Sequence, residues 1–197
     1  MGDLPSTSET LLARVRSPGD PAAWAEFAGV YGPLVYRAAR RGGLQDADAE
    51  DVRQDVLRAV AGAVDRFEHA PGTGALRRWL FTLTRNRLAD FYKSARHRDR
   101  GAGGTDAAVR LAEVPGAVSG ADWDRDFERG LFDAAAERVR PEVRPATWAA
   151  FWATAVDGRP GPEVAAELGM TVGAIHVARS RVLARLRAVV RELSGDD

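Results

Sequence analysis

The chain of 197 residues contains no cysteine, three histidines and, among its 28 basic residues, a single lysine. The absence of cysteine excludes disulfides and thiolate metal sites, and the three scattered histidines lack the spacing of metal ligands. No apolar run approaches the roughly 20 residues that a membrane span needs, and the acidic, polar N-terminus resembles no signal peptide. The sequence therefore predicts a cytoplasmic protein without membrane insertion, metal or cofactor.

The formal net charge is zero, but the charges are segregated along the chain. Acidic residues cluster between positions 46 and 55, whereas segments 77–100 and 179–191 are strongly basic. Segregated charge favours two different partners, and we expect the acidic surface to bind a protein and the basic surface nucleic acid.

Strand signals are nearly absent and helical periodicity recurs throughout, which predicts an all-α protein. The length allows one or two small domains. Residues 101–122 are rich in Gly and Ala and are interpreted as a flexible linker. We therefore expect two helical domains, 8–98 and 124–193, joined by a linker at 99–123.

Local signals mark the first long helix of the chain. Asp20 before Pro21 is typical of a helix start, with the carboxylate as N-cap and proline at the first helical position. The pair Gly32–Pro33 is expected to kink or break the helix that follows.

The segment from about Asp48 to Phe67 is predicted to be a helix with two unlike faces. Its apolar stripe consists of Val52, Val56, Val60, Ala63 and Phe67. The opposite face carries Asp51, Gln54, Asp55 and Arg58. This polar stripe is interpreted either as a protein-binding surface or as an ordinary solvated face.

A second helix, ending near His97, has a basic polar face. The basic stripe consists of Arg78, Arg85, Lys93 and Arg96, and the apolar arc of Leu76, Leu80, Leu83 and Phe91. Arg87 falls within the apolar arc, so either its guanidinium extends to solvent or the assumed phase of the helix is shifted. Tyr92 lies near the basic face and is the best candidate among the aromatic residues for stacking on a base. The alternative for the whole stripe is a solvated helix face.

The loop before this helix contains His69, Gly72, Thr73 and Gly74. Glycine permits close approach of the backbone to a ligand, although a plain interhelical loop is the alternative interpretation.

Residues 163–186 predict a helix-turn-helix. A short helix ends at Gly169, and Thr171 caps a longer helix. The exposed side of the longer helix is expected to carry Gly173, His176, Val177, Ser180 and Arg181. Such a helix can enter the major groove, where arginine pairs with guanine. The alternative is a helical hairpin with a solvated arginine face.

Taken in order, these motifs resemble a known family. The pattern AED..Q at 49–54, the glycine-containing loop and WL...TRN...D from Trp79 to Asp90 are similar to region 2 of bacterial RNA polymerase sigma factors. The helix-turn-helix is similar to region 4.2 of the same family. The resemblance covers roughly 10–98 and 125–192, and the short layout resembles the extracytoplasmic-function type.

The resemblance implies a role for each surface. The stripe Asp51, Gln54, Asp55, Leu57 and Arg58 would bind core RNA polymerase. The basic helix, with Arg78, Arg85, Asn86, Tyr92, Lys93 and Arg96, would contact the minus-ten element of promoter DNA. The alternative for Asn86 is that it fixes the geometry of the helix. The loop would capture a base of the melted non-template strand. The helix-turn-helix, through Thr171, His176, Val177, Arg179, Ser180 and Arg181, would read the minus thirty-five element. An anti-sigma factor is a further candidate partner.

Three positions depart from the family pattern. The family often has a basic residue at His176, usually an apolar one at Arg179 and usually phenylalanine at Leu57. The promoter sequence therefore cannot be carried over from relatives.

Two other functions remain as alternatives. One is a dimeric, polymerase-independent regulator that binds operator DNA through the same helix-turn-helix. The other is an enzyme that holds a metal at the acidic cluster 46–55, but that cluster lacks support from His or Cys. We expect no enzymatic activity.

Overall fold

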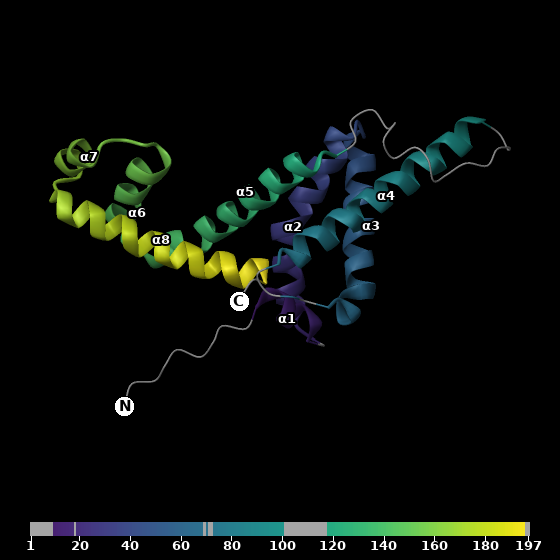
Figure 1. Ribbon diagram of the computed structural model, residues 1–197, viewed down its shortest axis with the longest axis horizontal. Coiled ribbons are helices and arrows are strands. Elements are labelled where there is room, and N and C mark those ends of the chain that lie inside the picture. The colour runs from purple at the N-terminus through teal and green to yellow at the C-terminus, as the bar shows by residue number, and fades with distance from the viewer. Residues whose placement is uncertain (1–9, 18, 69, 71–72, 101–117, 196–197) are drawn as a thin grey trace. The chain divides into compact units, whose positions relative to one another are not determined.

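The computed structural model describes residues 10–17, 19–68, 70, 73–100 and 118–195, without the side chains of 95–100. Within these residues the regular structure is helical and no strand occurs, which confirms the predicted all-α class (Figure 1). Tertiary contacts divide the chain into two compact units, Met1–Gly130 with Ser194–Asp197 and Leu131–Leu193. The boundary lies inside a helix, and the predicted domain limits stay predictions. Residues 101–117 of the predicted linker lie outside the described part.

The first unit begins with helices α1, Leu11–Arg16, and α2, Pro21–Arg41. The predicted start of α2 is confirmed, because Asp20 accepts a hydrogen bond of 2.8 Å from the backbone N–H of Ala23. This bond lowers the pKa of the Asp20 carboxyl. The cap therefore satisfies one of the N–H groups that a helix end leaves without a partner.

Helix α2 continues through Gly32–Pro33 with Pro33 inside it, so of the predicted kink or break the break is wrong, and the kink stays a prediction. Apolar residues on both sides of this position are buried: Phe27, Tyr31, Leu34, Val35 and Ala38. Burial of this face outweighs the one hydrogen bond that proline cannot donate. Glycine at position 32 leaves room for the next helix, because a Cβ there would lie 3.0 Å from a guanidinium nitrogen of Arg53 on α3.

The unit continues with α3, Asp46–Ala63, a 3₁₀ turn η1, Val64–Arg66, and α4, Ala75–Arg100. The predicted valines Val52, Val56 and Val60 are buried on α3, as are Leu76, Leu80 and Leu88 on α4. Helix α3 packs on both α2 and α4. Phe67 stacks on Trp79 at 4.4 Å between ring centroids, and this contact joins the end of the turn to the start of α4.

Helix α5, Gly120–Val139, contributes its first half to the first unit and its second half to the second unit. The second unit then contains η2, Arg140–Glu142, α6, Pro145–Phe151, a π-helical turn η3, Trp152–Val156, α7, Gly161–Leu168, and α8, Val172–Ser194. One core cluster joins α5, α6 and α8 through Ala135, Ala136, Val139, Phe151, Val182 and Leu186. A second joins α6, α7 and α8 through Ala150, Val164, Ala165, Ile175 and Ala178.

Candidate nucleic-acid and protein interfaces

The predicted polar stripe lies on the outer face of α3. Asp51, Gln54 and Arg58 are exposed, whereas Asp55 and Leu57 are half-buried. The Asp55 carboxylate pairs with the Arg58 guanidinium at 2.8 Å, and the Gln54 side chain donates to Glu50 at 3.3 Å. The stripe therefore carries both charge signs, and its side chains interact with neighbours on the same helix.

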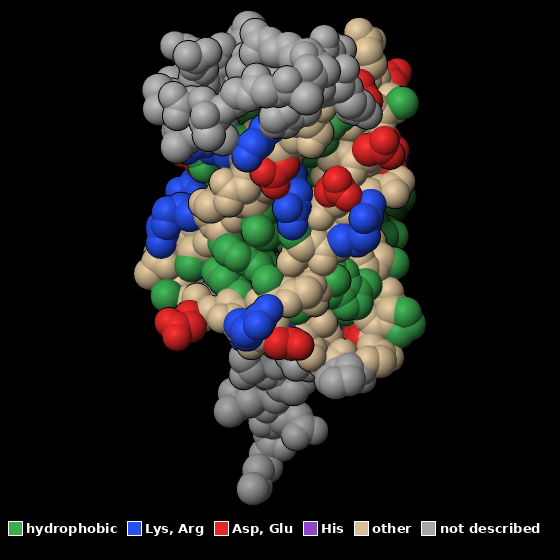
Figure 2. Space-filling model, turned by 90° about the vertical axis from the view of Figure 1, so that its right-hand side faces the viewer, with side chains coloured by type: hydrophobic (Ala, Val, Ile, Leu, Met, Phe, Trp, Pro, Cys, Tyr) green, Lys and Arg blue, Asp and Glu red, His purple; other side chains and the backbone are tan. Residues whose placement is uncertain are grey.

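Residues of α4 extend this surface, which the sequence did not predict. A hollow of about 460 Å³ between α3 and α4 is lined by Asp55, Arg58, Ala59, Arg87, Asp90, Phe91 and Ser94. Arg87 pairs with Asp90 at 3.3 Å and is partly exposed, as expected for a guanidinium that reaches solvent from the apolar arc. A charged residue within the apolar arc of α4 was the sequence feature that could have indicated a polar contact between α4 and α3. In Figure 2, seen from the side on which α3 and α4 lie in Figure 1, acidic and basic side chains surround hydrophobic ones.

The basic stripe follows the exposed face of α4. Arg78, Arg85, Asn86 and Lys93 are exposed, and the side chain of Arg96 lies outside the described residues. The Arg85 guanidinium lies 5.4 Å from the centroid of the Phe81 ring, a cation–π contact. The stripe thus keeps its charges at the surface, where they are available to phosphates.

Tyr92 is more constrained than its predicted stacking role requires. Its hydroxyl donates a hydrogen bond to the Gly42 carbonyl at the end of α2, and the ring is half-buried. Burial raises the pKa of the Tyr92 hydroxyl. Its contact with a base stays a prediction, and in this structure the side chain joins α4 to α2.

Thr73 and Gly74 of the predicted base-capture loop are described, whereas His69 and Gly72 lie outside the described residues. The Thr73 hydroxyl donates to the Ala70 carbonyl at 2.7 Å, and Gly74 has a φ of +64°, which favours glycine. Arg78 donates to the Thr73 carbonyl, so one residue of the basic stripe also holds the end of this loop.

The predicted helix-turn-helix is formed by α7 and α8. Gly169 adopts the left-handed conformation at φ +61°, and the Thr171 hydroxyl accepts a hydrogen bond of 3.1 Å from the Ala174 N–H. Both local predictions are confirmed. They satisfy backbone groups at the turn and fix where α8 begins.

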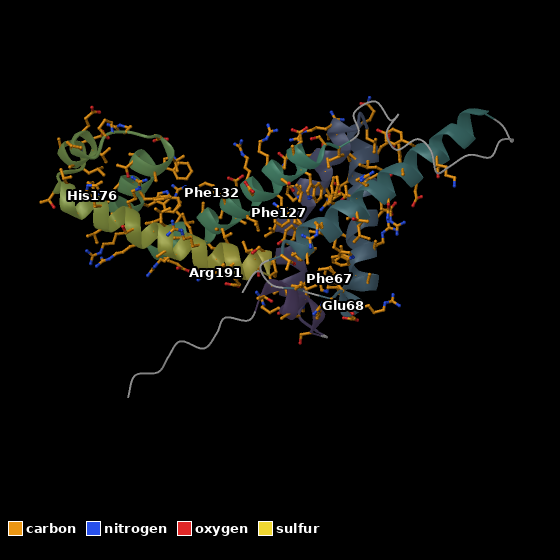
Figure 3. The ribbon with its side chains drawn as sticks, in the orientation of Figure 1. Phe67, Glu68, Phe127, Phe132, His176 and Arg191 are labelled. Carbon is orange, nitrogen blue, oxygen red and sulfur yellow. The ribbon has the colours of Figure 1, made fainter. Side chains whose placement is uncertain are left out.

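The face of α8 predicted to bind DNA is exposed. It carries Thr171, His176, Val177, Arg179, Ser180 and Arg181. Val177 is 49% exposed, and His176 lies near the N-terminal end of α8 (Figure 3). Ile175, Ala178 and Val182 are buried on the opposite side. In the described part of the chain neither Arg179 nor Arg181 forms an ion pair, and both guanidinium groups are available to a ligand.

A hollow of about 670 Å³ in the second unit was not predicted. Trp148 and Trp152 lie in its wall with acidic residues such as Asp133 and Glu137. Trp152 is 36% exposed and lies 5.7 Å from Trp148 between ring centroids. Phe151 is buried, whereas the next residue, Trp152, is not. The π-helical turn changes the periodicity here, and sequence patterns rarely reveal such turns.

Two further findings concern metal binding and membrane insertion in the described residues. No group of three or more His, Cys, Asp or Glu side chains there is arranged to hold a metal ion. No helix there is both long and apolar enough to cross a membrane.

Comparison with known proteins identifies the first unit. The family model for sigma-70 region 2 matches residues 28–98, the segment that carries the polar stripe, the loop and the basic stripe.

Similar proteins extend over nearly the whole chain. RNA polymerase sigma factor NccH of Alcaligenes xylosoxydans xylosoxydans is 28% identical over 189 residues, which cover 95% of this chain and 96% of that protein. RNA polymerase sigma factor CnrH of Cupriavidus metallidurans (strain ATCC 43123 / DSM 2839 / NBRC 102507 / CH34) is 26% identical over 188 residues, with coverage of 94% and 96%. A solved structure of CnrH in complex with the cytosolic domain of CnrY is 24% identical, covers 90% of this chain and 93% of that chain, and has a TM-score of 0.36.

Residues 28–98 thus match sigma-70 region 2, and over nearly its whole length the chain is similar to RNA polymerase sigma factors, which act in transcription initiation. The similarity to these sigma factors supports the extracytoplasmic-function type that the order of the motifs predicted.

Proposed function

We propose that the chain binds core RNA polymerase through α3 and directs it to promoters through α4 and α8, in the cytoplasm. The observation that carries this proposal is the position of the polar and basic stripes. Both lie within the segment that matches sigma-70 region 2, and both are exposed on neighbouring helices.

The α3 surface suits a protein partner better than a nucleic acid. Asp51 is exposed and acidic, and Leu57 is a half-buried apolar residue three residues after Gln54 on the same helix. Apolar contacts supply the association energy of such an interface, while charged residues around them determine the partner and its register. We assign Asp51, Gln54, Asp55, Leu57 and Arg58 to this contact, and the hollow beside Arg87 extends it.

The α4 surface suits the phosphate backbone and unpaired bases of a promoter. Arg78, Arg85 and Lys93 place three exposed cations along one helix. The loop at Thr73 and Gly74 adjoins them through the Arg78 hydrogen bond. Capture of a flipped base offsets the unstacking cost of a few kcal/mol and needs no nucleotide hydrolysis, so the proposed melting is driven by binding.

The α8 surface suits the major groove of duplex DNA. Arg181 and Arg179 are exposed and form no ion pair within the described residues, and either guanidinium is able to contact guanine with two hydrogen bonds. His176 and Ser180 lie on the same exposed side. Two DNA-binding surfaces on one chain raise each other's effective concentration at a promoter, particularly when polymerase holds both.

A polymerase-independent regulator is the second candidate, and the helix-turn-helix by itself would serve it. Such a regulator has no use for the α3 stripe or for the basic stripe of α4. An anti-sigma partner is implied by the family resemblance alone and stays a prediction.

The experiment that separates these candidates is run-off transcription with bacterial core polymerase and templates randomised in both promoter elements. A sigma factor should yield RNA that depends on the added chain and select two separated elements. The Arg181→Ala variant should alter the upstream element only. A chain that binds DNA without core and supports no transcription would be a regulator instead.

A further inference from the structure

The first half of α5, residues 120–130, packs on the first unit. The sequence predicts that these residues divide between the linker and the second domain. Trp123, Asp126 and Phe127 of this docking segment are 2%, 9% and 6% exposed. Their spacing of three and four residues places them on one face of the helix. The segment therefore makes a specific contact with region 2.

Aromatic rings provide the apolar part of this contact. Trp123 lies 5.5 Å from Phe81 of α4 between ring centroids, and Phe127 stacks on Tyr31 of α2 at 5.7 Å. Figure 3 shows Phe127 on α5 beside α2. The docking segment thus spans two helices of region 2.

Ion pairs surround the aromatic contacts. The Asp126 carboxylate lies 2.6 Å from the Arg41 guanidinium and 3.8 Å from that of Arg37. Close contact with Asp126 raises the pKa of Arg41. On α4, Arg77 lies 3.3 Å from Asp124 and 3.9 Å from Glu128. Three arginines of region 2 are therefore neutralised by three acidic residues of the docking segment.

This contact adjoins the surface proposed to bind DNA. Arg77 precedes Arg78 of the basic stripe, and Phe81 contacts both Trp123 and the Arg85 guanidinium. Arg37, Arg41 and Arg77 each keep between 33% and 42% of their side chains exposed. An acidic helix and a phosphate backbone would compete for guanidinium groups placed in this way.

We propose that Arg37, Arg41 and Arg77 form a further phosphate-binding surface of region 2, which the docking segment occupies in the free protein. Promoter DNA displaces residues 120–130 from this surface when the holoenzyme engages it. The inference rests on the proposed function, because the competitor is promoter DNA. It gives the acidic start of α5 a role in preventing the free chain from binding DNA indiscriminately.

The first test measures how the free, full-length chain binds a non-specific duplex at different salt concentrations. In Asp124→Asn with Asp126→Asn, Arg37 and Arg41 lose their carboxylate partner, Arg77 keeps only Glu128 at 3.9 Å, and the sequence of the second unit is unchanged. If all three then contact phosphates, the log–log slope should steepen by up to about 2.7 relative to wild type. Between about 50 and 200 mM salt this corresponds to an additional loss of affinity of roughly 40-fold.

The matched control is Asp65→Asn with Glu68→Asn. Both residues belong to the first unit, are exposed and form no ion pair within the described residues, and the change in net charge is the same. The control should keep the wild-type slope. Equal slopes in wild type and both variants, or equal steepening in both variants, would overturn the inference.

The second test measures amide hydrogen exchange in residues 120–130 of the unmodified chain. These amides should be protected in the free protein and exchange at least about tenfold faster in a promoter complex that makes RNA. Unchanged protection in that complex would show that the segment is a permanent part of region 2 and would overturn the inference. Failure of the proposed function would differ from both outcomes, because no transcription would then depend on the chain.

Discussion

Removing Arg85 and Lys93 from α4 should make promoter binding by the holoenzyme less sensitive to salt. Both side chains are exposed, and neither forms an ion pair within the described residues. Arg78 is left in place because it also holds the loop at Thr73. Each phosphate contact contributes about 0.9 to the log–log slope of affinity against salt, so the double Ala variant should lose about 1.8. Between about 50 and 200 mM salt, its affinity should fall roughly 12-fold less than that of wild type.

The assay is equilibrium binding of labelled promoter DNA to holoenzyme over a salt series. Arg66→Ala with Arg140→Ala serves as the control, because both residues are exposed and lie outside the proposed sites. The control should retain the wild-type slope. An unchanged slope in the α4 variant, or an equal decrease in the control, would show that the basic stripe is only solvated.

Three further predictions follow from single contacts or segments. Arg181→Ala should weaken binding by about 1–3 kcal/mol at one base pair of the upstream element and relax the base preference there. In a randomised-promoter selection, equal weakening at every position would show that Arg181 contacts only phosphate. Tyr92→Phe should lower the free energy of unfolding by about 0.5–1.5 kcal/mol at neutral pH, measured by urea unfolding. Burial raises the pKa of Tyr92 in the folded protein above its ordinary value of 10.0. The stability contributed by the Tyr92 hydroxyl is therefore fully present below pH 10.0 and is lost as the pH rises through the folded pKa. A difference in unfolding free energy between wild type and Tyr92→Phe that stays constant up to high pH would contradict this prediction. Shortening 101–117 by a few residues should reduce promoter activity gradually, and a Gly/Ser insertion there should have little effect; abrupt loss of core binding after the insertion would show that this segment makes contacts.

Local signals in the sequence predicted several of the helix ends. Asp20 and Thr171 cap helices through hydrogen bonds of their own side chains, and Gly169 ends one through its own backbone conformation. Such signals depend on the nearest few residues only. The valine stripe of α3 was predictable for a related reason, because helical spacing alone places Val52, Val56 and Val60 on one face.

Features that depend on distant residues could not be predicted. The sequence around Pro33 indicates a break, but burial of α2 on both sides of it keeps the helix continuous. Tyr92 is near the basic face by periodicity, yet its hydroxyl binds a carbonyl 50 residues earlier in the chain. The docking of Trp123 on Phe81 follows a segment of linker composition, which carries no information about its partner.

In the candidate site, too, local features were predictable from the sequence and features that depend on helix packing were not. Exposure of Asp51, Gln54 and Arg58 followed from helical spacing, as did that of His176 and its neighbours on α8. The contribution of Arg87 and Asp90 to the α3 surface did not, because it requires knowing how α3 and α4 pack.

Co-purification of core RNA polymerase with α3 variants tests the central claim most directly. Asp51→Arg with Gln54→Ala changes two exposed residues of the polar stripe and leaves the buried valines untouched. Asp65→Arg with Gln45→Ala makes the same chemical changes at exposed positions outside the stripe and serves as the control. Both variants should keep the helical circular dichroism spectrum of the wild type. The account predicts that core polymerase is lost with the stripe variant and retained at wild-type yield with the control. Retention at wild-type yield with both variants would contradict the assignment of α3 as the surface that binds polymerase.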